Sequence, residues 1–193
     1  MNNKMKLLLK SGHNVFNIDD LGLVWGQNKR SNTVQSARDY AKKGEIIRLR
    51  RGLYCLDKAK IKTEEMASRA FVPSYLTGES VLAMHGLIFG ASNEVHSASI
   101  RSKRIDINGT AFIYHMLKKE AFYNPIGIIH HDNYAVASLE RAIADLIYYY
   151  DGKYYFERLH NVDWDKLVEI GEIFGKKTVN KRIKELRRQH NGF

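Results

Sequence analysis

A basic hairpin pattern in residues 45–56 restricts the possible fold of this chain more than any other feature of its sequence. The segment has the sequence EIIRLRRGLYCL, in which isoleucine and leucine alternate with Arg48 and Arg50. A period of two is typical of a half-buried strand. The Arg-Gly pair at 51–52 can turn the chain, and residues 53–56 then return as a second strand. The pattern predicts a two-stranded hairpin with arginine at its tip.

Short amphipathic segments before this hairpin predict helices. Polar residues that can cap a helix precede two of these segments, and glycine follows each of them. We expect a helix over 5–10, a strand over 15–18, a second helix capped by Asp19 or Asp20, and a third capped by Ser31 and ending before Gly44.

The third predicted helix has one apolar face and one polar face. At 100° per residue, Val34, Ala37 and Ala41 share the apolar face. Short polar and amide side chains near a helix N-terminus suit the major groove of DNA, where Gln and Asn can pair with adenine. Arg38, at the edge of the apolar stripe, is expected to contact phosphate or to pack along the helix. The opposite face is predicted to carry Asn32, Gln35, Ser36, Asp39 and Lys43.

Helices followed by a basic hairpin form the pattern of a winged helix-turn-helix, here over residues 1–57. Arg48, Arg50 and Arg51 would then lie beside the phosphate backbone, or one of them would enter a minor groove. The alternative is a small helix-plus-hairpin module whose arginines are merely solvated.

The positive charge of the chain is concentrated at its two ends. The formal net charge is +10, with 31 Lys and Arg against 21 Asp and Glu. Residues 1–57 carry a net +6, residues 58–175 a net −2, and residues 176–193 a net +6. A polyanionic partner is therefore expected at the ends, although a solubilising role of the charge remains an alternative.

The remainder of the chain predicts a connector over 58–72 and a mixed α/β domain over 73–193. Strands are expected at 94–99, 104–107 and 110–117, with Asn108-Gly109 as a hairpin turn between the last two. The predicted fold class is α+β, with a winged helix-turn-helix, a mixed domain and a helical C-terminus. Helices are expected after the caps Thr77, Ser138, Asp163 or Asp165, and Thr178. The last helix presents a possible second basic surface made of Lys181, Arg182, Lys184, Arg187 and Arg188.

Several classes of site are excluded or disfavoured by the sequence. Cys55 is the single cysteine, so an intramolecular disulfide and a cysteine-based zinc site are excluded. No apolar run approaches the roughly 18 residues that span a membrane, and the N-terminus is unlike a signal peptide, so a cytoplasmic location is expected. Neither glycine-rich phosphate-binding motif is present, and no cofactor or metal is expected.

A catalytic role is disfavoured, with a metal-dependent nuclease as the one enzymatic alternative. Asp151 and Lys153 fit half of an Asp…(Asp/Glu)-x-Lys pattern, and Asp132 or Asp145 could supply the first carboxylate. Asp-Gly is also ordinary turn chemistry, however. The adjacent pair His130-His131 would point to opposite sides of a strand and chelate one metal poorly.

Three segments together resemble the AbiEi family of antitoxins and predicted transcriptional regulators of viral defence systems. They are GEIIRLRRGLY at 44–54, PSYLTGESVLAMHGL at 73–87 and ASLERAIADL at 137–146. Two departures from the family pattern are Val81, within the second segment, and Leu139, which replaces a proline.

The resemblance implies a sequence-specific DNA-binding autoregulator that serves as the antitoxin of a type IV toxin–antitoxin system. Its functional partner would be a nucleotidyltransferase toxin, which need not be contacted directly. Two alternatives stay open, namely a module that binds the toxin directly and the nuclease. The predicted DNA-binding residues are Arg30, Ser31, Asn32, Thr33, Gln35, Ser36, Arg38, Lys42, Arg48, Arg50, Arg51 and Tyr54.

Overall fold

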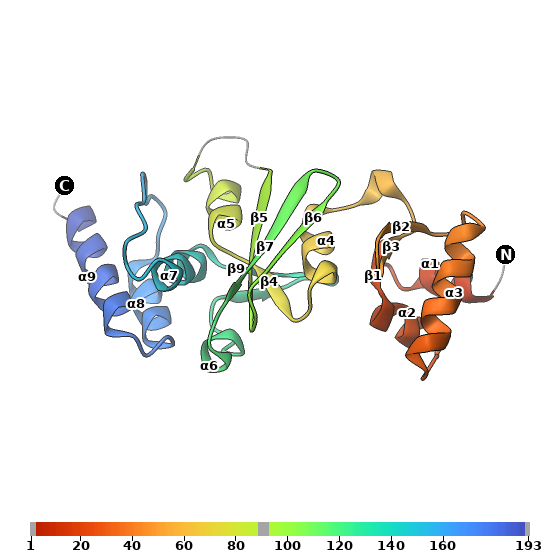
Figure 1. The fold of residues 1–193 in the computed structure, drawn as a ribbon. Coiled ribbons are helices and arrows are strands. Elements are labelled where there is room, and N and C mark those ends of the chain that lie inside the picture. Colours follow the sequence, from red (N-terminus) through yellow and green to blue (C-terminus); the bar gives the residue numbers. More distant parts are fainter. Residues whose placement is uncertain (1–2, 89–92, 192–193) are drawn as a thin grey trace. The chain divides into compact units, whose positions relative to one another are not determined.

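The computed structural model describes residues 3–88 and 93–191, and these residues form mixed α/β structure in two compact units. The first unit ends at Ala70 and the second begins at Phe71. Figure 1 shows the helices and strands of both units. The first unit contains α1 (Asn3–Lys10), β1 (Val15–Asn17), α2 (Ile18–Trp25), α3 (Arg30–Lys42), β2 (Ile47–Arg50), β3 (Leu53–Cys55), a 3-10 turn (Lys58–Lys60) and α4 (Thr63–Ala70).

The three helices α1–α3 pack around a small apolar core that a three-stranded antiparallel sheet closes. The strand order is β1-β3-β2, so β3 is central. The buried side chains of the core are Leu8, Phe16, Ile18, Leu21, Trp25, Ala37, Tyr40, Ile46 and Tyr54. The succession of α2, a short turn and α3 is compatible with the predicted helix-turn-helix, whereas its winged form stays a prediction.

The N-cap of the second helix lies earlier in the chain than the sequence predicts. Asn17 is the N-cap of α2, and its Oδ1 accepts hydrogen bonds from the backbone N–H groups of Asp19 and Asp20. The Asp20 carboxylate in turn accepts from the Asn17 N–H at 2.9 Å, which completes a capping box. The prediction that Asp19 or Asp20 is the cap was therefore wrong, because Asn17 satisfies the free N–H groups first.

Most of the predicted connector belongs to the first unit. Helix α4 packs on β1, and the buried Glu65 carboxylate accepts from the backbone N–H groups of Asn14 and Val15 at 2.9 and 3.1 Å. Arg69 adds an ion pair with Asp20 at 3.2 Å. These contacts keep residues 63–70 with the N-terminal helices, although the sequence predicts that they belong to a connector between the two domains.

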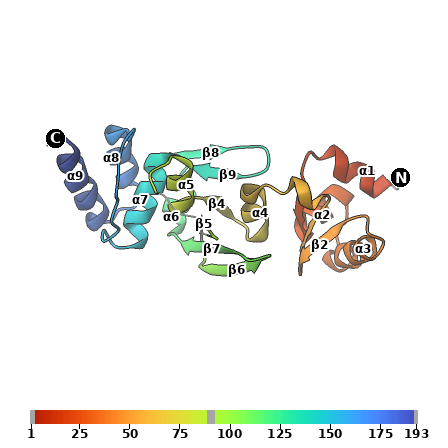
Figure 2. The ribbon, with the colours of Figure 1, turned by 90° about the horizontal axis from the view of Figure 1, so that it is seen from above.

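The second unit is built on a mixed six-stranded sheet with the strand order β6-β7-β5-β4-β9-β8. Helices α7, α8 and α9 pack against one another beside this sheet, as Figure 2 shows. Its elements are β4 (Ser74–Leu76), α5 (Glu79–Met84), β5 (Glu94–Ser99), β6 (Lys103–Ile107), β7 (Thr110–Met116), α6 (Lys119–Phe122), β8 (Ile128–His130), β9 (Ala135–Ala137), α7 (Leu139–Tyr149), α8 (Trp164–Glu172) and α9 (Lys177–Asn191).

Several local predictions for this unit are confirmed. The hairpin turn between β6 and β7 has Asn108 at φ 51° and Gly109 at φ 84°, as a type I′ turn requires. Ser138 caps α7 by accepting from the Arg141 N–H, and Asp163 caps α8 by accepting from the Lys166 N–H.

Two predicted caps were wrong because their hydroxyls bind other groups. Thr77 Oγ1 donates to the Asp145 carboxylate at 2.6 Å, and the cap position of α5 is Gly78. Thr178 lies inside α9 and donates to the Asp151 carboxylate at 3.1 Å. Strand β4 was missed, because its three residues are too few to show alternation.

Candidate nucleic-acid interface

The exposed face of α3 is determined by the side chains that the helix buries. Thr33, Ala37 and Tyr40 are buried, whereas Val34 and Ala41 are only half-buried. The predicted apolar face therefore included Ala37 correctly. Its centre was placed too close to Val34 and Ala41, which are less buried than Thr33 and Tyr40. Thr33, predicted to contact DNA, is 1% exposed, so its assignment was wrong.

Gly22 explains how Thr33 is accommodated in the core. A Cβ atom at position 22 would lie 3.3 Å from Thr33 Oγ1, so glycine lets α2 and α3 approach closely at this point. The Thr33 hydroxyl also donates to the Lys29 carbonyl, at 3.4 Å. The threonine thus packs between the two helices and satisfies its polar group locally.

The resulting exposed face of α3 follows the spacing i, i+4, i+7 and i+11. It comprises Ser31, Gln35, Arg38 and Lys42, all of which are exposed, with Asn32 exposed on the flank. Ser36 lies away from it, since its hydroxyl accepts from Lys4 Nζ at 2.9 Å and from Gln27 Nε2 at 3.1 Å. The prediction that Ser36 faces outward was wrong, because the helix is turned toward the side that buries Tyr40.

The hairpin of β2 and β3 contains an irregularity that separates its arginines. Arg48 pairs with Tyr54 and Arg50 pairs with Leu53, so Leu49 is an extra residue on β2. Such a bulge bends a strand and re-aims its side chains. Arg48 and Arg51 are exposed, whereas Arg50 is half-buried.

A concave site of about 330 Å³ lies between α3 and this hairpin. Its lining includes the four arginines Arg30, Arg38, Arg48 and Arg51. Helix α3 and the hairpin thus bring predicted residues from two separate elements to one site. The remaining lining residues, of which the sequence predicted only Tyr54, are Ile18, Val34, Gly52 and Tyr54.

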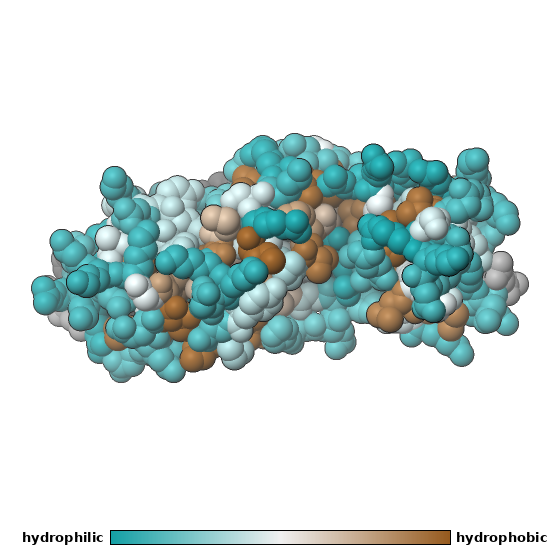
Figure 3. Space-filling model, turned by 60° about the horizontal axis from the view of Figure 1, so that its bottom comes forward, coloured by the Kyte–Doolittle hydropathy of each residue, from teal (hydrophilic) through white to brown (hydrophobic). Residues whose placement is uncertain are grey.

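Two predicted residues do not contribute a free polar side chain to this site. The first is Arg50, which is absent from the lining of the site. Its backbone carbonyl accepts a hydrogen bond from Arg48 Nε at 3.3 Å. Tyr54 is 3% exposed and belongs mainly to the apolar core. In the view of Figure 3, the surface of the first unit is mainly hydrophilic, with small apolar areas between hydrophilic side chains.

Neighbouring Cys55 lies on β3 and is fully buried. Burial raises the pKa of its thiol to about 11. The group is therefore a neutral packing side chain at physiological pH rather than a nucleophile.

The predicted second basic surface on α9 is only partly free of ion pairs. Arg187 pairs with Asp165 at 2.8 Å, and Arg182 pairs with Glu185 at 3.6 Å. Lys181 also pairs with Glu185, at 3.9 Å. Lys181, Lys184 and Arg188 line a shallow concavity of about 430 Å³ together with Glu185 and with Lys177, which the prediction omitted. These four cations recur at helical spacing and form one stripe, whereas Arg182 and Arg187 lie beside it.

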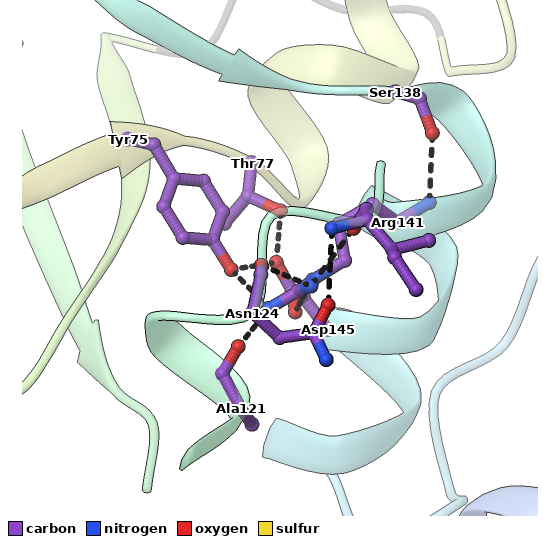
Figure 4. A network of polar contacts seen from close by, with 8 residues as sticks. Tyr75, Thr77, Ala121, Asn124, Ser138, Arg141 and Asp145 are labelled. Carbon is purple, nitrogen blue, oxygen red and sulfur yellow. Dashed lines mark hydrogen bonds and ion pairs between the residues drawn. The ribbon is translucent and has the colours of Figure 1, made fainter. Parts of the chain in front are cut away.

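The carboxylates of the nuclease alternative have different surroundings. Asp145 is fully buried, and its partners include Arg141, Tyr75 and Thr77 (Figure 4). Asp151 is exposed and pairs with Lys176 at 2.8 Å. Among residues 3–88 and 93–191, no group of three or more His, Cys, Asp or Glu is arranged to hold a metal ion.

Arg141 is a structural centre of the second unit. Its side chain is fully buried, and its guanidinium donates to five acceptors (Figure 4). The acceptors are Asp145 Oδ1, the Tyr75 hydroxyl, and the carbonyls of Ala121, Asn124 and Ile126. This network explains why α7 carries charged residues on its buried side, where the sequence predicts only an apolar stripe.

No helix in the described part of the chain combines the length and apolar character needed to cross a membrane.

Comparison with known families gives a match within the first unit. Residues 3–56 match the family model described as "Transcriptional regulator, AbiEi antitoxin". The matched segment runs from the start of α1 to the residue after β3, so it contains α3, the hairpin and the concave site between them. The family resemblance seen in the sequence is thereby confirmed for this segment. No curated protein matches the chain.

Proposed function

We propose that residues 3–56 form a winged helix-turn-helix that binds double-stranded DNA in a sequence-specific manner. The observation that carries this proposal is the concave site lined by four arginines between α3 and the hairpin. It lies in the segment that matches a transcriptional regulator family. The proposed function is repression of the chain's own operon by binding to an operator there.

Three arginines of the concave site, Arg38, Arg48 and Arg51, supply the affinity for the DNA backbone. Arg38 comes from the exposed face of α3, and Arg48 and Arg51 come from the hairpin. Cations that neutralise phosphates release condensed counterions, so binding of this kind weakens steeply as salt increases. The hairpin arginines lie beside phosphates or enter a minor groove, whereas α3 occupies the major groove.

The polar side chains on α3 supply the base contacts. Gln35 is exposed near the middle of the helix and its amide already donates to Asp39 at 2.9 Å. Glutamine can pair with the N6 and N7 groups of adenine. Ser31 and Asn32 lie one turn closer to the N-terminus, where recognition helices contact base edges.

In the cell, the same protein acts as the antitoxin of a type IV toxin–antitoxin system, without enzymatic activity of its own. Its functional partner is a nucleotidyltransferase toxin encoded beside it. The family matched by residues 3–56, described as a transcriptional regulator and antitoxin, supports the antitoxin role in this proposal.

The binding experiment is a mobility-shift titration with the duplex upstream of the gene and with a scrambled duplex of equal length. We expect tighter binding to the upstream duplex at moderate salt. Equal and salt-insensitive binding to both duplexes would contradict sequence-specific recognition.

A second candidate function, direct binding of an acidic protein partner, is favoured by the lysine stripe on α9. The stripe of Lys177, Lys181, Lys184 and Arg188 lies in the second unit, outside the segment that matches the regulator family. Co-purification of untagged toxin with the full chain tests this candidate. Retention of the toxin by the wild type and its loss when the four cations become glutamine would support direct binding.

A further inference from the structure

Arg30 is the first residue of α3 and borders two concave sites of the first unit. One is the site shared with the hairpin, and the other, of about 350 Å³, lies between α2 and the start of α3. The Arg30 guanidinium forms an ion pair with the Asp19 carboxylate of α2. The two side chains are 64% and 77% exposed, so the pair is accessible to a ligand.

Asp19 lies in the first turn of its own helix, α2. Its backbone N–H donates to Asn17 Oδ1 at 2.8 Å within the cap of α2. The N-terminus of a helix carries a partial positive charge, which favours a carboxylate in the first turn. A carboxylate at this place on the helix can orient the planar guanidinium that it binds.

The ion pair distinguishes Arg30 from the other three arginines of the concave site. Within the described residues, no ion pair is formed by Arg38, Arg48 or Arg51. Arg30 and Asp19 are together neutral, and the carboxylate would repel an approaching phosphate. Arg30 is therefore poorly suited to contacting the DNA backbone.

The same arrangement suits recognition of a base edge. Arginine presents a rigid fork of donors, and a bidentate pair with O6 and N7 of guanine is the commonest specific contact in the major groove. The N-terminal residues of a recognition helix contact base edges. Orientation by Asp19 reduces the conformational freedom that the long side chain loses on binding.

We propose that Arg30 recognises a guanine in the major groove and that Asp19 acts as its positioning residue. This inference rests on the proposed function, because it assigns one base contact within the same DNA-binding site. It predicts that the operator contains a guanine whose recognition depends on both side chains.

The test is selection of bound duplexes from a randomised pool by the full chain, followed by sequencing. The wild type is compared with Arg30→Lys, which keeps the charge, and with Asp19→Asn, which keeps the shape of the positioning side chain. Asp57→Asn is the matched control, since it removes an equal charge from the same unit, where Asp57 pairs with Lys60.

We expect the wild type to prefer guanine at one position by about tenfold, the preference that a bidentate pair provides. Arg30→Lys and Asp19→Asn should both lose most of this preference and retain the others, whereas Asp57→Asn should retain all of them. If the wild type binds DNA and both variants keep its guanine preference, the role of Arg30 and Asp19 is overturned. The proposed function would not be affected by that result. Absence of DNA binding by the wild type would instead contradict the proposed function itself.

Discussion

The rings of Trp25 and Tyr40 lie 5.4 Å apart, centroid to centroid, and this contact joins α2 to α3. Tyr40 is 6% exposed, and Trp25 is 7% exposed. Because Tyr40 is buried, α3 presents Ser31, Gln35 and Arg38 to solvent. The contact thus decides which side chains of α3 are available to a ligand.

Tyr40→Ala should destabilise the first unit by about 3 kcal/mol or more, because it removes an aromatic side chain from a small core. Urea unfolding of the full chain, followed by tryptophan fluorescence and circular dichroism, measures the effect. Tyr155→Ala is the control, since Tyr155 is 77% exposed. An equal free energy of unfolding for the wild type and Tyr40→Ala would refute the role of this contact.

Gln35→Ala should relax sequence preference and leave the affinity for non-specific DNA nearly unchanged. The amide of Gln35 lies on the exposed face of α3, whereas the hydroxyl of Ser36 is engaged by Lys4 and Gln27. Competition titrations with single-base operator variants measure the preference. If Ser36→Ala altered base preference more than Gln35→Ala did, the proposal that α3 presents Gln35 to the DNA would be contradicted.

Arg141→Met should destabilise the second unit by about 3–5 kcal/mol, since it leaves the Asp145 carboxylate buried without its cation. Adding Asp145→Leu to this variant should restore part of the loss. Asp151→Asn, which changes an exposed ion pair, should have little effect. Chemical denaturation of the four proteins provides the comparison, and equal stability of Arg141→Met and wild type would argue against a structural centre at Arg141.

The stability of the second unit should decrease as the pH falls from about 6.5 to 4. Burial and the neighbouring His96 lower the pKa of His115 to about 4. The unfolded chain therefore binds a proton in this window that the folded chain does not, so stability is present above it and lost toward acid. Urea titrations at pH 7 and 4.5 should show a smaller loss for His115→Gln than for the wild type, and an equal loss would contradict this linkage.

Local signals in the sequence predict much of the fold. The Asn108-Gly109 turn and the caps Ser138 and Asp163 depend on interactions within a few residues, and the structure confirms them. The strand at 94–99 is also confirmed, and its signal is the local sequence pattern. Thr77 and Thr178 were assigned wrongly as caps, because their partners Asp145 and Asp151 are distant in the sequence.

The sequence predicts which arginines belong to the candidate site but not how they are arranged. The arginines of α3 and the hairpin were identified from charge and periodicity. The orientation of α3 depends on the packing of Tyr40 against Trp25, and the separation of Arg48 from Arg50 depends on a bulge. Asp19 was assigned a capping role, since nothing in its local sequence indicates an ion pair with Arg30.

The salt dependence of DNA binding tests the central claim, that the arginines between α3 and the hairpin form the DNA-binding site. The measurement is a fluorescence anisotropy titration of one duplex at several salt concentrations. The wild type is compared with the triple variant Arg38→Ala, Arg48→Ala, Arg51→Ala. The control is Lys58→Ala, Lys60→Ala, Lys62→Ala, which removes three exposed cations of the same unit from outside the concave site.

If each arginine contacts one phosphate, the slope of log K against log salt should become shallower by about three in the arginine variant. The lysine control should keep a slope close to that of the wild type. An arginine variant with the slope and affinity of the wild type, or a control that loses as much as the arginine variant, would contradict the proposed interface.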